Sequence, residues 1–159
     1  MKESFAKPSS CSRVTLVQVM LPEDANPSGN VHGGTIMKLI DNAAYVVASR
    51  HCRMNAVTAS VDRINFHAPV FVGNLLHLKA NLNWTGKTSM EIGVRVEAEN
   101  LKTGGIVHTA SAYLTFVALD ENGKPQPVPA VILETEEDKR RFEQAAERVM
   151  LRKTGVCRI

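Results

Sequence analysis

Residues 35–52 read TIMKLIDNAAYVVASRHC, and this stretch decides how the rest of the chain is interpreted. Its apolar residues recur at intervals of three and four, the spacing of one helix face, and small residues fill most of the other positions. We therefore predict a helix from Gly34 to Cys52 that is apolar around most of its circumference and largely buried. Such a helix, about five turns long, needs other elements on most of its sides.

The segment before this helix predicts a loop. Residues 22–34 read PEDANPSGNVHGG, a concentration of turn formers that does not suit the interior of a helix or strand. Upstream of it, Val14 to Leu21 predicts a strand that stops at Pro22. Residues 1–12 are polar and aperiodic, and we expect a flexible lead-in.

Four strands are predicted after the helix, at 57–66, 76–84, 90–99 and 106–119. The second and third alternate apolar with polar residues, so each is expected to have one wet face, and the turn TGKT between them predicts a hairpin. The fourth is predicted to be a central strand. The expected wet positions are His77, Lys79, Asn81 and Asn83 on one strand and Glu91, Gly93, Arg95, Glu97 and Glu99 on the other.

A second helix is predicted near the C-terminus, from Glu134 to Lys153, after a proline-rich connector. Acidic residues come first and basic residues last, which suits the helix dipole. Its expected apolar stripe consists of Phe142, Ala145, Ala146, Val149 and Met150. Segregated helix and strand runs favour an α+β fold in which one antiparallel sheet curls around the first helix. We expect one domain over 13–129, followed by a helix and tail over 130–159.

Composition limits the function classes. The 159 residues are 44% hydrophobic with a net charge of +3, which excludes bulk disorder and gives no argument for a nucleic-acid partner. No run of about 18 apolar residues occurs, so we expect no membrane insertion. The N-terminus lacks the apolar core of a secretory signal, and the three cysteines lack paired spacing, so we expect free thiols and a cytoplasmic location.

Common catalytic and metal motifs do not occur in the chain. Its five histidines form no pair with metal-ligand spacing, so no metal site is predicted. A GxSxG elbow for a nucleophilic serine is also missing.

Three groups of residues in order along the chain resemble the hotdog-fold acyl-CoA thioesterases. The first is Asn26-Pro27-Ser28-Gly29 with His32-Gly33-Gly34, Met37 and Asp41. The second is Ser60 to Phe66 with Pro69, Val70 and Gly73, and the third is Trp84-Thr85-Gly86-Lys87-Thr88-Ser89. The resemblance covers Val14 to Pro129. It implies a hotdog fold, in which an antiparallel sheet wraps one long central helix.

Gly33 and Gly34 open the central helix, where unpaired N–H groups carry positive potential and can hold an oxyanion. Glycine there lets a thioester carbonyl approach closely, although a plain tight turn would also explain both residues. Asn26 can direct its amide at a water or a carbonyl, or can simply be a turn residue. Asp41, among apolar neighbours, suits a general base or a carboxylate paired with a nearby cation. The resemblance implies that Asn26 and Asp41 act together from facing subunits.

The resemblance also implies a site for coenzyme A. Gly86, Lys87, Thr88 and Ser89 match the turn by which the family holds CoA, and Lys87 is expected to face a phosphate. The alternative is a plain hairpin turn with a solvated lysine. Arg63 is either a phosphate contact or a salt-bridged surface residue. The basic residues of the C-terminal helix are interpreted as a solvated face.

The implied function is hydrolysis of acyl-CoA thioesters to a free acid and CoA, with no cofactor required because CoA belongs to the substrate. The implied assembly is a homodimer, with a trimer of dimers as the larger unit. Two alternatives remain. A hotdog dehydratase acting on hydroxyacyl thioesters would use His32, and a non-catalytic acyl-CoA binding or sensing domain would keep the glycines and lose Asn26 or Asp41.

Overall fold

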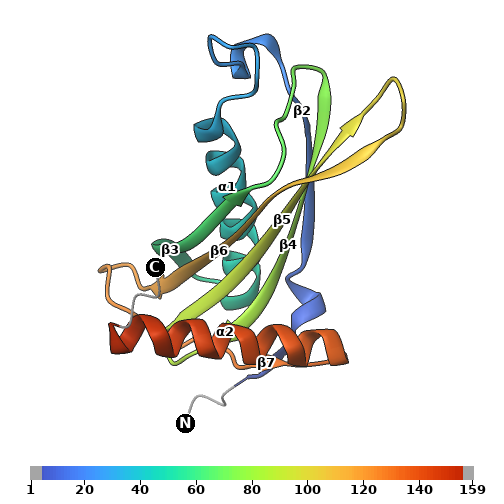
Figure 1. Ribbon diagram of the computed structural model, residues 1–159. Coiled ribbons are helices and arrows are strands. Elements are labelled where there is room, and N and C mark those ends of the chain that lie inside the picture. Colours follow the sequence, from blue (N-terminus) through green and yellow to red (C-terminus); the bar gives the residue numbers. More distant parts are fainter. Residues whose placement is uncertain (1–4, 156–159) are drawn as a thin grey trace.

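Five long strands form one antiparallel sheet that curves around helix α1 in the computed structural model, which describes residues 5–155 (Figure 1). The strand order is β2-β4-β5-β6-β3. A second helix, α2, lies across the other face of the sheet. The elements are β1 (Lys7–Pro8), η1 (Ser9–Cys11), β2 (Val14–Val19), η2 (Pro22–Asp24), α1 (Gly33–Cys52), β3 (Asn55–Phe66), β4 (Asn74–Thr85), β5 (Ser89–Asn100), β6 (Ile106–Leu119), β7 (Val131–Ile132) and α2 (Glu136–Thr154).

Helix α1 packs against all five long strands, which confirms the predicted α+β fold with a sheet wrapped around one helix. The helix buries one apolar face against alternate residues of β4, β5 and β6. Its opposite face, however, is open in the single chain, because the sheet covers only one side. Met37 is 45% exposed and Tyr45 46% exposed. The prediction of a helix buried nearly all round is therefore wrong for the protomer.

The hairpin between β4 and β5 is confirmed, with Leu82 opposite Ile92 and a turn at Gly86 to Thr88. Strand β6 is an interior strand as predicted, although β5 occupies the middle position. Within residues 5–155, strand β3 pairs only with β6, and it forms one edge of the sheet. Two short strands, β1 and β7, were not predicted, and they pair in parallel beside the end of α1.

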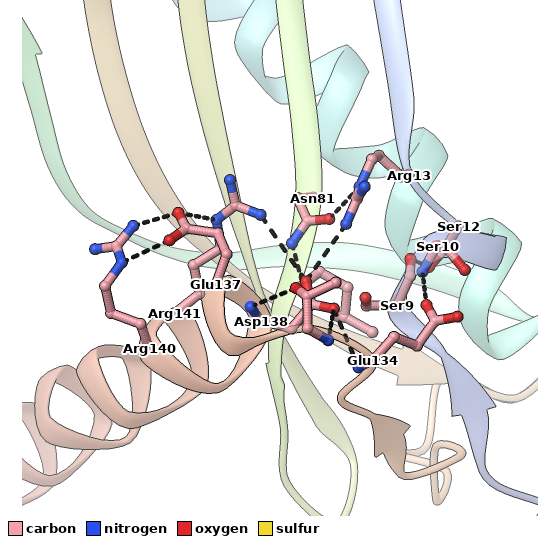
Figure 2. A network of polar contacts seen from close by, with 12 residues as sticks. Ser9, Ser10, Ser12, Arg13, Asn81, Glu134, Glu137, Asp138, Arg140 and Arg141 are labelled. Carbon is pink, nitrogen blue, oxygen red and sulfur yellow. Dashed lines mark hydrogen bonds and ion pairs between the residues drawn. The ribbon is translucent and has the colours of Figure 1, made fainter.

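The polar residues of β4 and β5 were predicted to face solvent, and this prediction is wrong where α2 covers them. Asn81, Asn83 and Glu91 are all buried on the outer face of the sheet, where α2 covers them. Glu91 is fully buried because Arg148 of α2 reaches it, with Nη2–Oε1 at 2.7 Å. Figure 2 shows the first turn of α2, where Asp138 meets Arg13 at the start of β2.

The position of α2 is close to the prediction, but its contact face differs. Thr135 caps its N-terminus by accepting a hydrogen bond from the Asp138 backbone N–H at 3.1 Å. Ala145 and Val149 are buried, as the predicted stripe requires. Met150 is 61% exposed, so its place in that stripe was wrong.

Two of the three cysteines, Cys11 and Cys52, are free thiols, and Cys157 lies outside the described residues. Burial raises the pKa of the Cys52 thiol. In residues 5–155, neither helix combines the length and the hydropathy that a membrane span requires.

Candidate active site

The loop before α1 is shaped by Asn26. Its Oδ1 accepts hydrogen bonds from the backbone N–H groups of Ser28 (2.9 Å) and Asn30 (3.2 Å). Gly29 adopts φ +86°, which a residue with a side chain rarely does, and its N–H donates to the Asn26 carbonyl at 3.0 Å. Asn26 therefore does act as a turn residue in this loop. The side-chain NH₂ of Asn26 takes no part in either of these bonds.

The start of α1 presents a backbone donor to this loop. His32 is the N-cap residue, and its Nδ1 accepts the Gly34 N–H at 3.2 Å. This bond occupies one of the two N–H groups that the sequence suggests for an oxyanion. The Gly33 N–H is in the first helical turn, where intrahelical acceptors are lacking. The two donors are thus not equivalent, and Gly33 is the better candidate.

Neither glycine is explained by turn geometry. Only a positive φ would favour glycine there, and neither Gly33 nor Gly34 has one. A Cβ at Gly33 would meet only Phe66 Cζ, at 3.9 Å, which is an ordinary contact. The missing side chain at Gly33 therefore leaves open space beside an N–H group, which is what a carbonyl needs in order to approach closely.

A cavity of about 340 Å³ brings Asn26 and Gly33 together. The remaining lining comes from the loop, the first turn of α1, the last residue of β3 and the segment that follows it, and it combines apolar side chains with one amide and one imidazole. These residues are Asn30, Val31, Ile36, Phe66, His67, Ala68, Pro69 and Val70. We refer to it as the helix-start cavity.

Asp41 lies outside the helix-start cavity of its own chain. It is eight residues further along α1 than Gly33, a rise of about 12 Å, and it is half-buried rather than buried. Its Oδ1 accepts a hydrogen bond from the Thr58 hydroxyl of β3 at 2.6 Å. No cation pairs with Asp41 among the described residues, so the ion-pair alternative has no support.

The predicted CoA turn lies at the other end of α1. Gly86 donates to the Ser89 carbonyl at 2.8 Å and closes the β4–β5 hairpin. A Cβ at Gly86 would be 2.6 Å from Trp84 Cη2, so this turn requires glycine for packing alone. The Thr88 carbonyl accepts a hydrogen bond from the Ala118 N–H of β6 at 3.1 Å, and the Lys87 carbonyl accepts one from the Val128 N–H, after β6, at 2.9 Å. The Lys87 side chain is exposed.

Arg63 is separated from this turn in the single chain. The sheet register places Ser89 level with Val57 of β3, and Arg63 is six residues further along that strand. Because β3 has two bulges over this stretch, the same span corresponds to four residues of β6, from Val117 to Tyr113, an offset of about 13 Å along the strands. The chain therefore brings Asn26 and Gly33 together, but leaves Asp41, Arg63 and the hairpin turn apart.

Sequence reasoning missed Thr58 and the capping role of His32. A threonine in a strand is ordinary, and only the packing of β3 against α1 shows that its hydroxyl meets Asp41. The cap could have been anticipated, because a polar side chain directly before a helix often accepts an N–H of the first turn.

The chain is similar to curated proteins along most of its length. The family described as "Thioesterase superfamily" matches residues 28–104. An uncharacterized acyl-CoA thioester hydrolase of Bacillus subtilis is 42% identical over 142 residues, covering 89% of this chain and 83% of that protein. The cytosolic acyl coenzyme A thioester hydrolase of mouse is 42% identical over 143 residues, covering 89% of this chain and 38% of the longer mouse protein.

The solved structures that resemble this chain are also acyl-CoA thioesterases or acyl-CoA hydrolases. A hexameric acyl-CoA thioesterase, solved in its apo form, superimposes with a TM-score of 0.92 at 41% identity, over 97% of this chain and 99% of that chain. The acyl-CoA hydrolase of Staphylococcus aureus, solved with butyryl-CoA and CoA, gives 0.87 at 35% identity over 94% and 91%. Variants of that enzyme with one asparagine, one aspartate or one threonine replaced by alanine have also been solved. Because the identity and coverage hold over nearly the whole fold, the chain belongs to the acyl-CoA thioester hydrolases of the thioesterase superfamily.

Proposed function

We propose that this chain hydrolyses acyl-CoA thioesters at a site shared by two copies of the chain. The observation that carries this proposal is the separation of the two reactive groups. Asn26 and Gly33 line the helix-start cavity, whereas Asp41 lies two helical turns away beside Thr58. Both halves lie along β3, one of the two edge strands of the sheet.

A second copy that pairs along β3 would complete the site. Edge strands present unpaired N–H and C=O groups, and Val57, Val61 and Phe66 on β3 are 40–49% exposed. In an antiparallel, two-fold pairing, the Thr58 end of one β3 lies beside the Phe66 end of the other. Asp41 of one copy then approaches the helix-start cavity of its partner. The open face of α1 would be covered in the same assembly.

The chemistry follows from this arrangement. The thioester carbonyl oxygen accepts the Gly33 N–H, which stabilises the negative charge that forms on this oxygen in the tetrahedral intermediate. Asp41 accepts a proton from a water molecule that attacks the carbonyl carbon, or it attacks that carbon directly and forms an acyl anhydride, which a water molecule hydrolyses after CoA has left. The C–S bond then breaks, and CoA leaves as a thiol after protonation. Thr58 fixes the orientation of the carboxylate, and the Asn26 NH₂ orients the reacting group.

CoA is proposed to contact the hairpin turn at Gly86, Lys87, Thr88 and Ser89, together with Arg63. Since these residues are far apart in one chain, a CoA site that uses them would also be built from more than one copy. A trimer of dimers is the proposed assembly, supported by the hexameric relative at 41% identity. A cytoplasmic location and a role in fatty acid metabolism belong to the same proposal, with the cytosolic mouse relative in support.

The two alternatives have less support. A hydroxyacyl thioester dehydratase would need His32 as its acid or base, but His32 Nδ1 is the acceptor that caps α1. A non-catalytic acyl-CoA binding domain has no need of a carboxylate held by a threonine, and this chain has that pair at 2.6 Å.

Thiol release from a panel of acyl-CoAs tests the function. We expect wild-type protein to release CoA from at least one chain length, and Asp41→Asn to lower kcat by about two to four orders of magnitude. Glu23→Gln is the matched control, because it neutralises an exposed carboxylate. It should keep wild-type kcat. Substrate binding without thiol release would favour the sensing domain, and near-normal kcat in Asp41→Asn would refute the assigned base.

A further inference from the structure

Strand β3 contains two β-bulges between the residues that it contributes to the site. The eight steps along β3 from Thr58 to Phe66 correspond to only six steps along the neighbouring strand β6. The two extra residues are Ala59 and Asp62, which have no opposite residue in β6. Bulges of this kind are common at sheet edges and beside active sites, where they redirect side chains.

The two bulges together place Thr58 and Phe66 on the α1 side of the sheet. Successive side chains of a strand point to opposite faces, so a slip of one residue turns a side chain to the other face. If the bulge at Ala59 were lost while residues 60–66 kept their register, Thr58 would move one position along β6 and point away from α1. Its hydroxyl could then no longer donate to Asp41.

Arg152 of α2 contacts the segment between the two bulges. Helix α2 crosses the outer face of the sheet, and its C-terminal end lies beside β3 (Figure 1). The Arg152 Nη1 lies 2.8 and 2.7 Å from the two carboxylate oxygens of Asp62, in the second bulge. The same nitrogen lies 2.9 Å from the hydroxyl oxygen of Thr115 on β6 and 3.3 Å from that of Ser60 on β3. Because Ser60 and Thr115 are directly opposite each other in the sheet, this one nitrogen joins both strands at the register position between the bulges.

The contact is made where the sheet itself gives β3 least support. Each bulge interrupts the ladder of backbone hydrogen bonds between β3 and β6. Within residues 5–155, the other side of β3 has no neighbouring strand. The Arg152 and Asp62 side chains are only 32% and 19% exposed, so salt screens their attraction less than that of a pair in open solvent.

We propose that Arg152 is a positioning residue for thioester hydrolysis. Through Asp62 and Ser60 it fixes the register of β3, and thereby the contact of Thr58 with Asp41. Arg152 does not line the helix-start cavity and acts only through this strand. The inference rests on the proposed function, in which Asp41 activates the attacking water or attacks the thioester itself.

Steady-state thiol release by the full-length Arg152→Gln variant tests this role. We expect kcat to fall about tenfold while KM changes less than about twofold, because Asp41 loses its orientation and the substrate keeps its contacts. Asp62→Ala should give a similar loss, since it removes the acceptor of the same ion pair. Single substitutions are used because removal of the whole of α2 would also uncover Glu91, and the loss of stability would mask the effect on β3.

Lys153→Gln is the matched control for Arg152→Gln. It removes the neighbouring positive charge from the same turn of α2, at an exposed position. This control should keep the wild-type kcat and KM. Wild-type kcat in Arg152→Gln, a loss confined to KM, or an equal loss of kcat in Lys153→Gln would overturn the proposal.

A double variant separates positioning from a general weakening of the fold. Thr58→Val keeps the shape of the side chain and removes the hydroxyl that donates to Asp41. If Arg152 acts through that contact, adding Arg152→Gln to Thr58→Val should lower kcat by less than about twofold further. A purely structural role would lower kcat by the same factor in both backgrounds, and that result would refute the assignment.

Amide hydrogen exchange gives a readout that does not depend on activity. Exchange in residues 55–66 should be faster in Arg152→Gln than in wild type, because β3 opens more readily, whereas Lys153→Gln should match wild type. Unchanged exchange in β3 would overturn the register argument. If the wild-type chain releases no thiol, the proposed function fails, and the exchange measurement still decides whether Arg152 holds β3. Asp62→Ala takes the place of Arg152→Gln in each comparison if that variant loses its wild-type thermal midpoint.

Discussion

The ion pair between Glu91 and Arg148 should be the main polar attachment of α2 to the sheet. Glu91 is fully buried on β5, and its carboxylate accepts hydrogen bonds from Arg148 at 2.7 and 3.1 Å and from Asn83 at 3.2 Å. The Arg148 guanidinium also lies 3.7 Å from the centre of the Tyr113 ring. Removing Arg148 therefore leaves the buried Glu91 carboxylate without its cationic partner.

Arg148→Met keeps a long apolar side chain at this position and removes the charge. Loss of one partner of a buried pair costs about 3–5 kcal/mol, because the other charge stays desolvated. Of the side chains that the structure describes, Asn83 is then the one that still donates to Glu91. Since 1 kcal/mol corresponds to about 2–4 °C in a domain of this size, the thermal midpoint should fall by about 6–20 °C.

Urea unfolding at one fixed chain concentration provides the assay, because an oligomer's stability depends on concentration. Lys139→Met is the control, since Lys139 pairs with Glu136 in solvent, and it should leave the urea midpoint nearly unchanged. The double variant Glu91→Met with Arg148→Met should recover most of the loss, because no charge is left buried. A loss below 1 kcal/mol in Arg148→Met, or a double variant no more stable than the single one, would refute this reasoning.

Three further outcomes are expected. Truncation before Glu134 should lower the thermal midpoint more than it lowers kcat, because α2 covers the outer face of the sheet; loss of kcat at an unchanged midpoint would contradict this. Gly33→Ala should fold normally, because its Cβ meets only Phe66 at 3.9 Å, yet cut kcat in the thiol-release assay by blocking the carbonyl; full activity would remove Gly33 from the site. Burial lowers the pKa of His51 below its ordinary 6.5, so its contribution to stability is present above that pH and is lost as the pH falls. Unfolding at pH 7.5 and 5.5 should show a smaller loss for His51→Asn than for wild type, and equal losses would contradict the assignment.

Hydrophobic periodicity was sufficient to predict α1 and the five long strands of the sheet. It failed on the outer face, where alternating polar residues predict solvent. Glu91 meets an arginine 57 positions later in the chain, and no local pattern distinguishes such a partner from water. The same limit explains why α1 was expected to be largely buried although Met37 and Tyr45 are exposed, because periodicity does not say how many sides of a helix one chain covers.

The candidate site likewise contains residues that the sequence predicted and residues that only the folded chain reveals. Asn26 and Gly33 were predicted from a motif, and the chain places both on one cavity. Thr58 was not predicted, because its contact with Asp41 depends on how β3 crosses α1. Arg63 and the hairpin turn stay apart in one chain, so their proposed role depends on assembly.

Mixing two inactive variants as subunits tests the shared site most directly. Asp41→Asn chains keep Asn26, and Asn26→Ala chains keep Asp41, so a mixed dimer contains one intact site and one site that lacks both groups. Random pairing makes half of the dimers mixed, and the co-refolded sample should regain about a quarter of the wild-type kcat per chain. If demonstrably mixed dimers stay as inactive as the separate variants, the two residues do not serve one site across the subunit boundary.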